Sequence, residues 1–480
     1  MADSILLYNG TVLFHEGNKV KFLHNYDVLI QGSKISKIGQ GLQLEFNGRM
    51  LDCSGKIISP GFIDTHHHLW QTQLKGRHGD EVLVDYMVSG MLQSFNYEPE
   101  DMFWGQLAGC IESIDSGVTT VVDHANLTYS PAHATEALRA TASSGLRTIF
   151  CYGVMPRLKK WTSEFEMDTE IFPEWWHSTL ETLAKSQPFG NGRVTLGFSF
   201  DMFKLPRDII TDIWTKCRNL GLKILTTHYS SPAMPNSIKM LSDYGLLDKD
   251  IIVSHANNIS EEDARTLAKN DVYISSTPET ELQFGPGDVV AFRDDIRSHA
   301  SVGLDCHSTN SSDLLTQIRI CLQHSRATVA GKVFQQEGKQ PRELTIKLEE
   351  AFNLGTIQGA RAVNMENQIG SIAEGKLADI IVFDTQSPAM VCAAEENPLA
   401  AVLLHSSVRD IETVIIDGII RKENKQLCHV EILTEPNGNE KEKWSWSEVS
   451  RNLLDSRLRI KKRGEGQDYA VAKKTLFGTS

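Results

Sequence analysis

The sequence predicts an α/β fold, a (β/α)8 TIM barrel with a small composite β-sandwich domain formed by both chain ends. Three observations predict it. Alternating β patterns occupy both ends of the chain, eight apolar runs alternate with helical stretches between them, and 480 residues suit a large barrel with an appendage. The 41% hydrophobic and 23% charged residues are typical of a globular protein that builds a large core.

The first 55 or so residues have the pattern of short antiparallel strands. Alternation with Gly or Asn punctuation runs through ILLYNGTVL, YDVLIQGSKISKIG and MLDCSGKII. The same pattern returns in GKLADIIVFD and VRDIETVIIDGIIRKENKQL. Two such segments bracketing the chain predict one β domain, built from residues 1–57 and 371–430.

Between these ends, helical stretches separate short apolar runs, which favours βα units and a parallel sheet. The eight candidate strands are 57–68, 118–125, 146–154, 193–200, 223–228, 250–256, 272–278 and 301–306. Eight strands in series predict a closed barrel over residues 58–370. A doubly wound open sheet is the alternative, but no GxGxxG motif follows the first strand.

Two intervals between strands are long and rich in Trp, Phe and Met. They are residues 69–116 and 155–192, and long insertions after barrel strands usually form lids and substrate walls. Residues 431–480 form a C-terminal extension. Its segment WSWSEVSRNLLDSRLRI predicts an amphipathic helix used for packing or for subunit contact.

The charge and the cysteines restrict the class of partner and the compartment. A formal net charge of -13 argues against a nucleic-acid partner, and the one dense basic run, residues 461–463, has the character of a solvated tail. The chain shows no secretory signal and no apolar run of the ~20 residues that a membrane helix needs. Eight cysteines without a CxxC pair predict free thiols in the cytoplasm.

The strongest motif is Thr65-His66-His67-His68, at the end of the first barrel strand. Side chains at i and i+2 of a strand project to the same face, so His66 and His68 converge while His67 points away. Two imidazoles at the C-terminal end of a barrel strand form half of a metal site. Taken alone, the motif is also compatible with a histidine-rich turn that binds nothing.

Three further polar residues close apolar runs at the same end of the barrel. His228 ends the fifth strand, His255 lies near the end of the sixth, and Asp305 ends the eighth. A single histidine at a strand end is more often a buried or capping residue. Their coincidence at strands one, five, six and eight predicts a shared site at the barrel mouth.

These motifs resemble the amidohydrolase superfamily. PGFIDTHHHLWQT, TTHYSS, VSHANNIS, VGLDCHSTNSSD and GSIAEGKLADIIVFD look like its ATZ/TRZ branch of chlorohydrolases and aminohydrolases, relatives of cytosine deaminase, over about residues 1–425. The resemblance implies a barrel with a β-sandwich from both termini. It also implies that His66, His68, His228 and Asp305 bind a divalent metal, and that His255 orients the attacking water or the substrate.

We expect one metal ion per chain. Binuclear members carry a carbamylated lysine on strand four, whereas this strand, RVTLGFSF, has none and Lys204 falls beyond it. Three imidazoles and a carboxylate suit Zn²⁺, and Fe²⁺ fits the same set. The metal would lower the pKa of bound water towards ~7, and Asp305 would take the proton and pass it to the leaving group.

One position departs from the pattern of deaminase relatives. They carry a Glu three residues after the fifth-strand histidine, where it protonates a ring nitrogen, and Ser231 takes that place here. A serine hydroxyl cannot act as a carboxylic acid, so adenosine- or cytosine-type deamination is in doubt. Glu279 and Glu281, after strand seven, are replacement acids or surface residues of a loop, with the surface interpretation favoured for Glu281.

Residues near the strand ends are candidates for substrate contact. Proximity to the motifs predicts a substrate-binding set of Gln71, His124, Tyr152, Ser231, Glu279 and His307. Asp123 ends strand two beside His124. The aromatic residues Tyr152, Phe200, Phe203, Trp70 and Trp104 together predict an apolar pocket, although each alone is more often core.

Three functional hypotheses follow. The first is a hydrolase in which metal-bound hydroxide attacks an electrophilic carbon of a small cyclic or aromatic substrate and expels ammonia, an amine or a halide. The second keeps the metal for dehydration, isomerisation or decarboxylation in secondary metabolism. The third is a scaffold without activity, against which the ligand set speaks. The resemblance leaves a homodimer or a larger homo-oligomer open.

Overall fold

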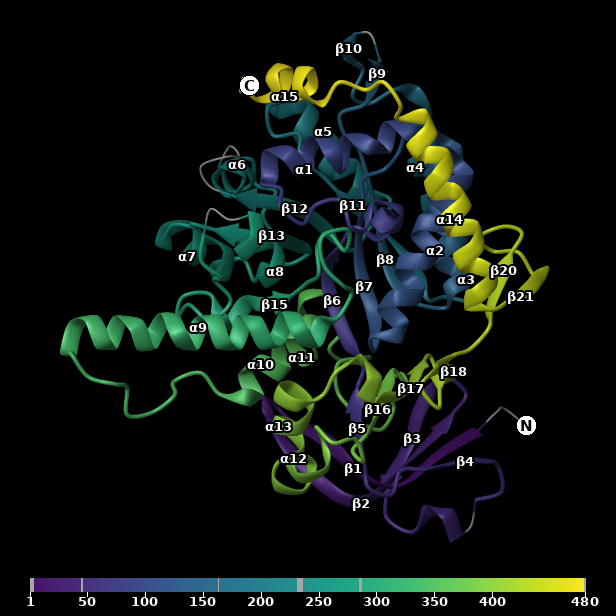
Figure 1. The fold of residues 1–480 in the computed structure, drawn as a ribbon, viewed down its shortest axis with the longest axis vertical. Coiled ribbons are helices and arrows are strands. Elements are labelled where there is room, and N and C mark those ends of the chain that lie inside the picture. The colour runs from purple at the N-terminus through teal and green to yellow at the C-terminus, as the bar shows by residue number, and fades with distance from the viewer. Residues whose placement is uncertain (1–3, 45, 163, 231–235, 285–286, 479–480) are drawn as a thin grey trace.

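The computed structural model describes residues 4–44, 46–162, 164–230, 236–284 and 287–478. Its centre is an eight-stranded parallel sheet whose strands neighbour one another in chain order (Figure 1). The strands are β6 (Phe62–His67), β7 (Val118–Ala125), β8 (Arg147–Gly153), β11 (Val194–Ser199), β12 (Leu225–Ser230), β13 (Ile251–Asn257), β14 (Tyr273–Ser276) and β15 (Ala300–Val302). Each of the eight apolar runs overlaps one of these strands.

The sheet closes into a barrel where its first and last strands meet. His67 and Asp305 form a parallel bridge. The backbone N–H groups of Leu304 and Asp305 both donate to the carbonyl of His66, at 3.0 and 2.8 Å. The structure therefore confirms the predicted barrel, and residues of the histidine motif take part in closing it.

Helices surround the barrel and follow its strands. They are α2 (Pro99–Asp115), α3 (Pro131–Ser144), α4 (Glu174–Ser186), α5 (Arg207–Asn219), α6 (Ser237–Asp243), α7 (Glu261–Lys269), α8 (Pro278–Phe284), α9 (Leu314–Glu337), α10 (Leu348–Leu354) and α11 (Ile357–Ala362). Figure 1 shows α9 extending well beyond the barrel. An apolar layer between strands and helices, with Trp176, Trp214 and Phe198 fully buried, holds them in place.

The interior of the barrel changes from apolar to polar along the strands. Near the strand starts it is filled by Ile63, Val122, Ile149 and Ile252, which cluster with Ala360 of α11. The side chains that follow towards the strand ends are polar, and they form the site described below. An apolar plug under a polar mouth is the arrangement in which barrel enzymes hold their active sites.

Both chain ends build the β domain. Its sheet has nine strands in the order β19-β18-β17-β16-β5-β1-β2-β3, with β4 beside β1. Their bounds are β1 (Ser4–Glu16), β2 (Lys19–Gln31), β3 (Lys34–Gly39), β4 (Arg49–Asp52), β5 (Lys56–Pro60), β16 (Ile380–Asp384), β17 (Ile411–Ile416), β18 (Ile419–Glu423) and β19 (Gln426–Leu427). Side chains from both ends share one core, as predicted for a composite domain.

Two predicted strands need correction. The run 57–68 is two strands, β5 in the β domain and β6 in the barrel, which separate at Gly61. A Cβ at Gly61 would lie 2.1 Å from Oγ1 of Thr119, so this crossing admits only glycine. The run 301–306 is a strand only to Val302, and Asp305 lies in the following loop with a φ of 60°.

The C-terminal extension packs on the insertion 69–116. It comprises β20 (Val430–Leu433), β21 (Lys441–Trp444), α14 (Trp446–Arg463) and α15 (Tyr469–Phe477). On α14, Ser456 donates to Oδ1 of the buried Asp101 at 2.7 Å, and Arg463 pairs with the same carboxylate. The predicted amphipathic helix is therefore a packing element on α2, while Leu454 and Leu458 remain 60% and 65% exposed.

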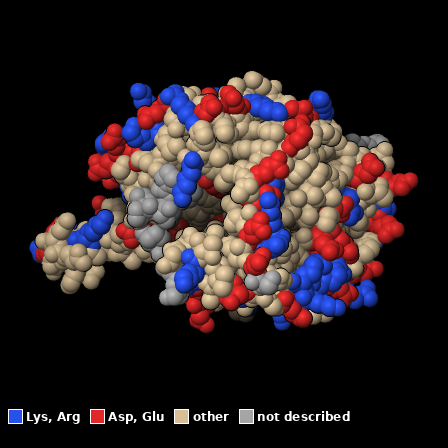
Figure 2. Space-filling view, turned by 90° about the horizontal axis from the view of Figure 1, so that it is seen from above, with Lys and Arg blue, Asp and Glu red and all other residues tan. Residues whose placement is uncertain are grey.

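Parts of the insertions after β6 and β8 lie at the upper end of the molecule in Figure 1. The first contains α1 (Leu83–Ser89), and the second contains the hairpin β9 (Leu158–Trp161) and β10 (Phe165–Met167). Figure 2 shows this end from above, with acidic and basic side chains mixed over the face and a hollow near its middle. Within the described parts of the chain, no helix is both long and apolar enough to span a membrane.

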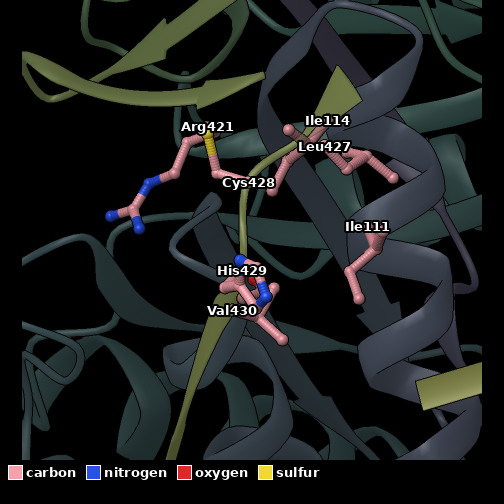
Figure 3. Close-up of a pocket in the computed structure, with 8 residues that line it drawn as sticks. Ile111, Ile114, Arg421, Leu427, Cys428, His429 and Val430 are labelled. Carbon is pink, nitrogen blue, oxygen red and sulfur yellow. The ribbon is translucent and has the colours of Figure 1, made fainter. Parts of the chain in front are cut away.

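A cavity of about 10 Å³ lies between α2 and the C-terminal strands (Figure 3). Its lining includes Ile111, Ile114, Arg421, Leu427 and Cys428. A void of that size holds at most a single water molecule. It is therefore a packing defect between the barrel and the β domain rather than a substrate pocket.

Candidate metal centre

Histidines and an aspartate from four strand ends meet at the barrel mouth. His66, His228, His255 and Asp305 each offer one ligand atom, and these atoms all lie within 4.8 Å of one another. His68 joins them, since its Nε2 lies 3.2 Å from Oδ1 of Asp305. The five residues that the sequence motifs single out for the metal and the water are therefore in one cluster.

The spacing of these atoms fits a metal ion. Nε2 of His66 and Nε2 of His68 are each 3.2 Å from Oδ1 of Asp305. Ligands at ~2.0–2.2 Å from a tetrahedral zinc lie about 3.3–3.6 Å from one another. A charge-assisted N–H···O hydrogen bond is shorter, at ~2.7–2.9 Å. The donor set and its spacing therefore fit a divalent cation.

The imidazoles are turned so that Nε2 is free to coordinate. Nδ1–H of His68 donates to the carbonyl of His124 at 3.0 Å, and Nδ1–H of His228 donates to Asp201 at 2.9 Å. Nδ1 of His255 lies 2.8 Å from the hydroxyl of Thr277. Hydrogen bonds of this kind fix the tautomer and the ring orientation of histidines that bind metals.

Burial and neighbouring side chains set the protonation states of His66, His255 and Asp305. Burial lowers the pKa of His66 well below its usual value and that of His255 to about 4, so both rings are neutral at physiological pH. Burial would raise the pKa of Asp305, but the adjacent imidazoles of His66, His68 and His255 hold it well below its usual value. Neutral imidazoles and an ionised carboxylate are the forms that coordinate a cation.

Two residues of the cluster have left-handed backbone conformations. The φ of Asp305 is 60° and that of His255 is 69°, and neither residue is glycine. Such residues are uncommon, cost free energy, and concentrate at functional sites, where the surrounding structure enforces them. Both residues offer a ligand atom to the cluster at the barrel mouth.

The sequence matches the profile of the amidohydrolase family over residues 57–203 and 213–420. The chain belongs to the amidohydrolase family. It is 27% identical over 435 residues to a 5-methylthioadenosine/S-adenosylhomocysteine deaminase of Thermococcus sibiricus, covering 86% of this chain and 93% of the relative. It is 26% identical over 420 residues to a 5'-deoxyadenosine deaminase of Methanobrevibacter smithii, covering 83% and 89%.

Solved structures share the fold of this amidohydrolase. An adenosine deaminase from Xanthomonas campestris with bound zinc superimposes with a TM-score of 0.76 at 16% identity, over 96% of this chain and 99% of that one. A zinc complex of atrazine chlorohydrolase from Arthrobacter aurescens gives a TM-score of 0.76 at 17% identity, over 95% and 100%. At this level of identity, the likeness concerns the fold.

The family and the relatives decide between the hydrolytic and non-hydrolytic hypotheses. They support an enzyme that hydrolyses C–N bonds other than peptide bonds in small cyclic substrates. They do not favour dehydration, isomerisation or decarboxylation. The family also uses a divalent metal, which agrees with the ligand cluster of the amidohydrolase.

Asp201 is a residue of the cluster that the sequence motifs do not single out. It follows β11, and its carboxylate lies 2.9 Å from Nδ1 of His228 and 3.2 Å from Nε2 of His124. The signal was present, because Asp201 directly follows the apolar run RVTLGFSF. The rule that a polar residue closing a barrel strand marks the site, applied to strand four as to the others, finds it.

Two of the six predicted substrate-binding residues lie at or beside the cluster. The ring of His124 is 4.4 Å from that of His228, measured between centroids. The amide of Gln71 donates to the hydroxyl of Tyr86 at 2.7 Å and accepts from Ser308 at 2.9 Å. Gln71 therefore ties the insertion after β6 to the loop that carries Asp305.

Three others point elsewhere. The ring of Tyr152 stacks on Trp176 of α4, between the barrel and its helices. His307 follows Asp305 by two positions, so a continuing strand would place both side chains on one side. Instead, Nδ1 of His307 lies 2.9 Å from Nε2 of His67, away from Asp305. The reason is that the strand ends at Val302 and the loop turns His307 behind the cluster.

The third of these residues, Glu279, contacts a helix outside the barrel. Its carboxylate accepts a hydrogen bond from Gln317 of α9 at 2.6 Å. Burial raises the pKa of Glu279 to about 7. Ser231 lies outside the described residues.

The predicted aromatic pocket is wrong, because its members are core residues. Phe200 and Phe203 pack on each other at 5.2 Å, between the barrel and α5. Trp70 packs against Tyr97 at 5.2 Å, and Trp104 stacks on Trp444 at 5.5 Å. The first pair fills the layer under the helices, and the two tryptophans fix the insertion after β6.

The surface interpretation of Glu281 is also wrong. Glu281 lies on α8 and is only 3% exposed. Its carboxylate accepts hydrogen bonds from the backbone N–H of Thr277 at 2.6 Å and from the hydroxyl of Ser276 at 2.9 Å. Because Thr277 also contacts His255, Glu281 supports the cluster from behind. Burial raises the pKa of Glu281 to about 8.

We expect Glu281→Gln to reduce the loss of stability at alkaline pH. The folded-state pKa of Glu281 lies above the ordinary value of 4.5. Its contribution to the free energy of unfolding is therefore fully present below pH 4.5 and is lost as the pH rises through about 8. The melting temperature of the glutamine variant, relative to wild type, should rise by about 2 °C or more between pH 5.5 and pH 9. Exposed Glu262→Gln is the control, and an unchanged difference would contradict the prediction.

Proposed function

We propose that this amidohydrolase holds one zinc ion and hydrolyses a C–N bond of a small heteroaromatic substrate, releasing ammonia or an amine. The observation that carries the proposal is the convergence of Nε2 of His66 and His68 on Oδ1 of Asp305, with His228 beside them. Those four residues would hold the metal. Its chemistry, when bound, is to acidify a water molecule and to polarise the substrate.

The roles of the protein groups follow from their positions. Asp305 is an ionised carboxylate at the centre of the cluster, so it can accept the proton of the attacking water and return it to the leaving nitrogen. His255 is neutral and is held through Nδ1 by Thr277, so Nε2 can position that water or the substrate. We assign His124 and Gln71 to the wall of the substrate site.

The relatives and the residues at the strand ends suggest the substrate class. The relatives are named for deamination of 5-methylthioadenosine, S-adenosylhomocysteine and 5'-deoxyadenosine. An exocyclic amino group on a nitrogen heterocycle is therefore the bond that we propose for cleavage, with halide release as the variant known from the chlorohydrolase fold neighbour. Ser231 in place of the usual Glu argues that ring protonation is supplied by another group.

The remaining assignments belong to the same proposal. Residues 58–370 are the catalytic domain, residues 1–57 and 371–430 the β domain, and residues 431–480 an extension. All eight cysteines are unpaired, which suits a reducing cytoplasm. Exposed Leu454 and Leu458 on α14 offer an apolar contact for a homo-oligomer.

Hydrolysis predicts the origin of an oxygen atom. In ¹⁸O-labelled water, the product of a single turnover should carry one ¹⁸O at the carbon that lost nitrogen, and the mass should shift by about 2 Da. Mass spectrometry of the product, with release of ammonia measured in parallel, checks this. A product without the label would favour the non-hydrolytic hypothesis, whereas conversion in unlabelled water serves as the control.

A further inference from the structure

Asp201 lies between two histidines of the cluster. It follows β11, and its side chain is 28% exposed at the barrel mouth. Oδ2 is 2.9 Å from Nδ1 of His228 on β12 and 3.2 Å from Nε2 of His124 on β7. Oδ1 accepts the backbone N–H of His228 at 2.8 Å and lies 3.2 Å from the hydroxyl of Thr227. Both oxygens of the carboxylate are therefore occupied by donors.

The contact with Asp201 decides which nitrogen of His228 carries hydrogen. A carboxylate only accepts hydrogen bonds, so Nδ1 of His228 must be the donor. The lone pair of a neutral His228 then resides on Nε2. His228 is also the member that the ligand cluster of His66, His255 and Asp305 shares with Asp201 and His124. A carboxylate behind a metal-binding histidine typically raises its basicity and fixes its orientation.

We propose that Asp201 is a positioning residue of the metal centre, which holds His228 in the tautomer and orientation that coordinate the metal and locks His124 beside it. This role rests on the proposed metal centre. It differs from that of Asp305, because Asp201 acts through His228. With this role, β11, the fourth barrel strand, takes part in the metal centre although it carries no metal-binding lysine.

An amide at position 201 opposes this role more strongly than a methyl group does. Whichever way the side chain of the Asp201→Asn variant is turned, its NH₂ group faces either the backbone N–H or the Nδ1–H of His228. The second conflict is relieved when the hydrogen of His228 moves to Nε2, which then cannot coordinate. Alanine removes the acceptor without imposing the wrong tautomer, and water can take its place because this side chain is partly exposed.

The test is zinc affinity, measured by competition with a chromogenic chelator on metal-free protein. We expect Asp201→Ala to weaken zinc binding about 10-fold and Asp201→Asn about 100-fold. Exposed Asp208→Asn, on α5, is the matched control and should bind like wild type. Histidine ¹⁵N shifts in metal-free protein should show the hydrogen of His228 on Nδ1 in wild type and on Nε2 in the asparagine variant.

Each other result contradicts the proposal. Wild-type affinity in Asp201→Asn, or a larger loss in the alanine variant than in the asparagine variant, would overturn the positioning role while leaving the metal centre intact. Wild-type protein that binds no zinc would overturn the metal centre itself. Should Asp201→Asn not fold, Asp201→Glu, which keeps an acceptor, must bind zinc more tightly than Asp201→Ala, and the reverse order overturns the role.

Discussion

Asp305→Ala is expected to lower kcat/KM by about 10³-fold or more on any substrate that the wild type turns over. Asp305 contacts both His66 and His68, and it is the carboxylate of the ligand cluster that also includes His255. Its removal takes away one proposed ligand and the group that we propose carries the proton to the leaving nitrogen. The measurement is steady-state kinetics of ammonia release at saturating zinc.

The control is Asp294→Ala, since the side chain of Asp294 is 93% exposed and lies outside the cluster. It should retain wild-type kinetics. Asp305→Asn keeps the shape of the side chain but cannot accept a proton in the same way, so it should lose turnover while changing KM less. Wild-type turnover in Asp305→Ala would contradict the hydrolytic mechanism.

His228→Ala is expected to empty the metal centre. Wild-type protein purified without added metal should contain about one equivalent of zinc or iron per chain. The variant should contain about a tenth of that or less, because the imidazole cannot be replaced by a neighbour at the same point. Elemental analysis by mass spectrometry, together with circular dichroism to confirm folding, makes the comparison.

Exposed His24→Ala, in the β domain, controls for the loss of a histidine elsewhere and should keep the metal. A well-folded wild type that contains no metal and takes up none on titration would contradict the proposed hydrolase. It would favour the scaffold hypothesis instead. Equal metal content in wild type and His228→Ala would remove His228 from the ligand set.

The barrel and most of its mouth could be predicted from local patterns. Apolar runs are typical of buried parallel strands, and the polar residues that close them lie at the same rim. His66, His68, His228 and Asp305 could be found for this reason. The side that a residue faces beyond the strand end could not be predicted in this way. His307 follows Asp305 by two positions, yet the loop turns it towards His67.

Other errors come from contacts between distant parts of the chain. Glu281 has the local sequence of a polar loop, but α8 turns it inward onto Ser276 and Thr277. Tyr152 is one residue out of phase with the interior of β8, whose inward positions include Ile149 and Cys151. Alternation tells which side chains point into the barrel only when the register of the strand is known. The register is a property of the closed sheet.

The contacts between α14 and Asp101 have a consequence for synthesis of the chain. The hydrogen bond from Ser456 joins residues 355 positions apart, and Arg463 reaches the same carboxylate. A ribosome must therefore synthesise the chain through α14 before the insertion that contains Asp101 receives its partner. Until then Asp101 lacks the groups that neutralise it in the folded protein. Nascent chains would pass through a stage with a formed barrel and an unfinished rim, when chaperone binding would matter most.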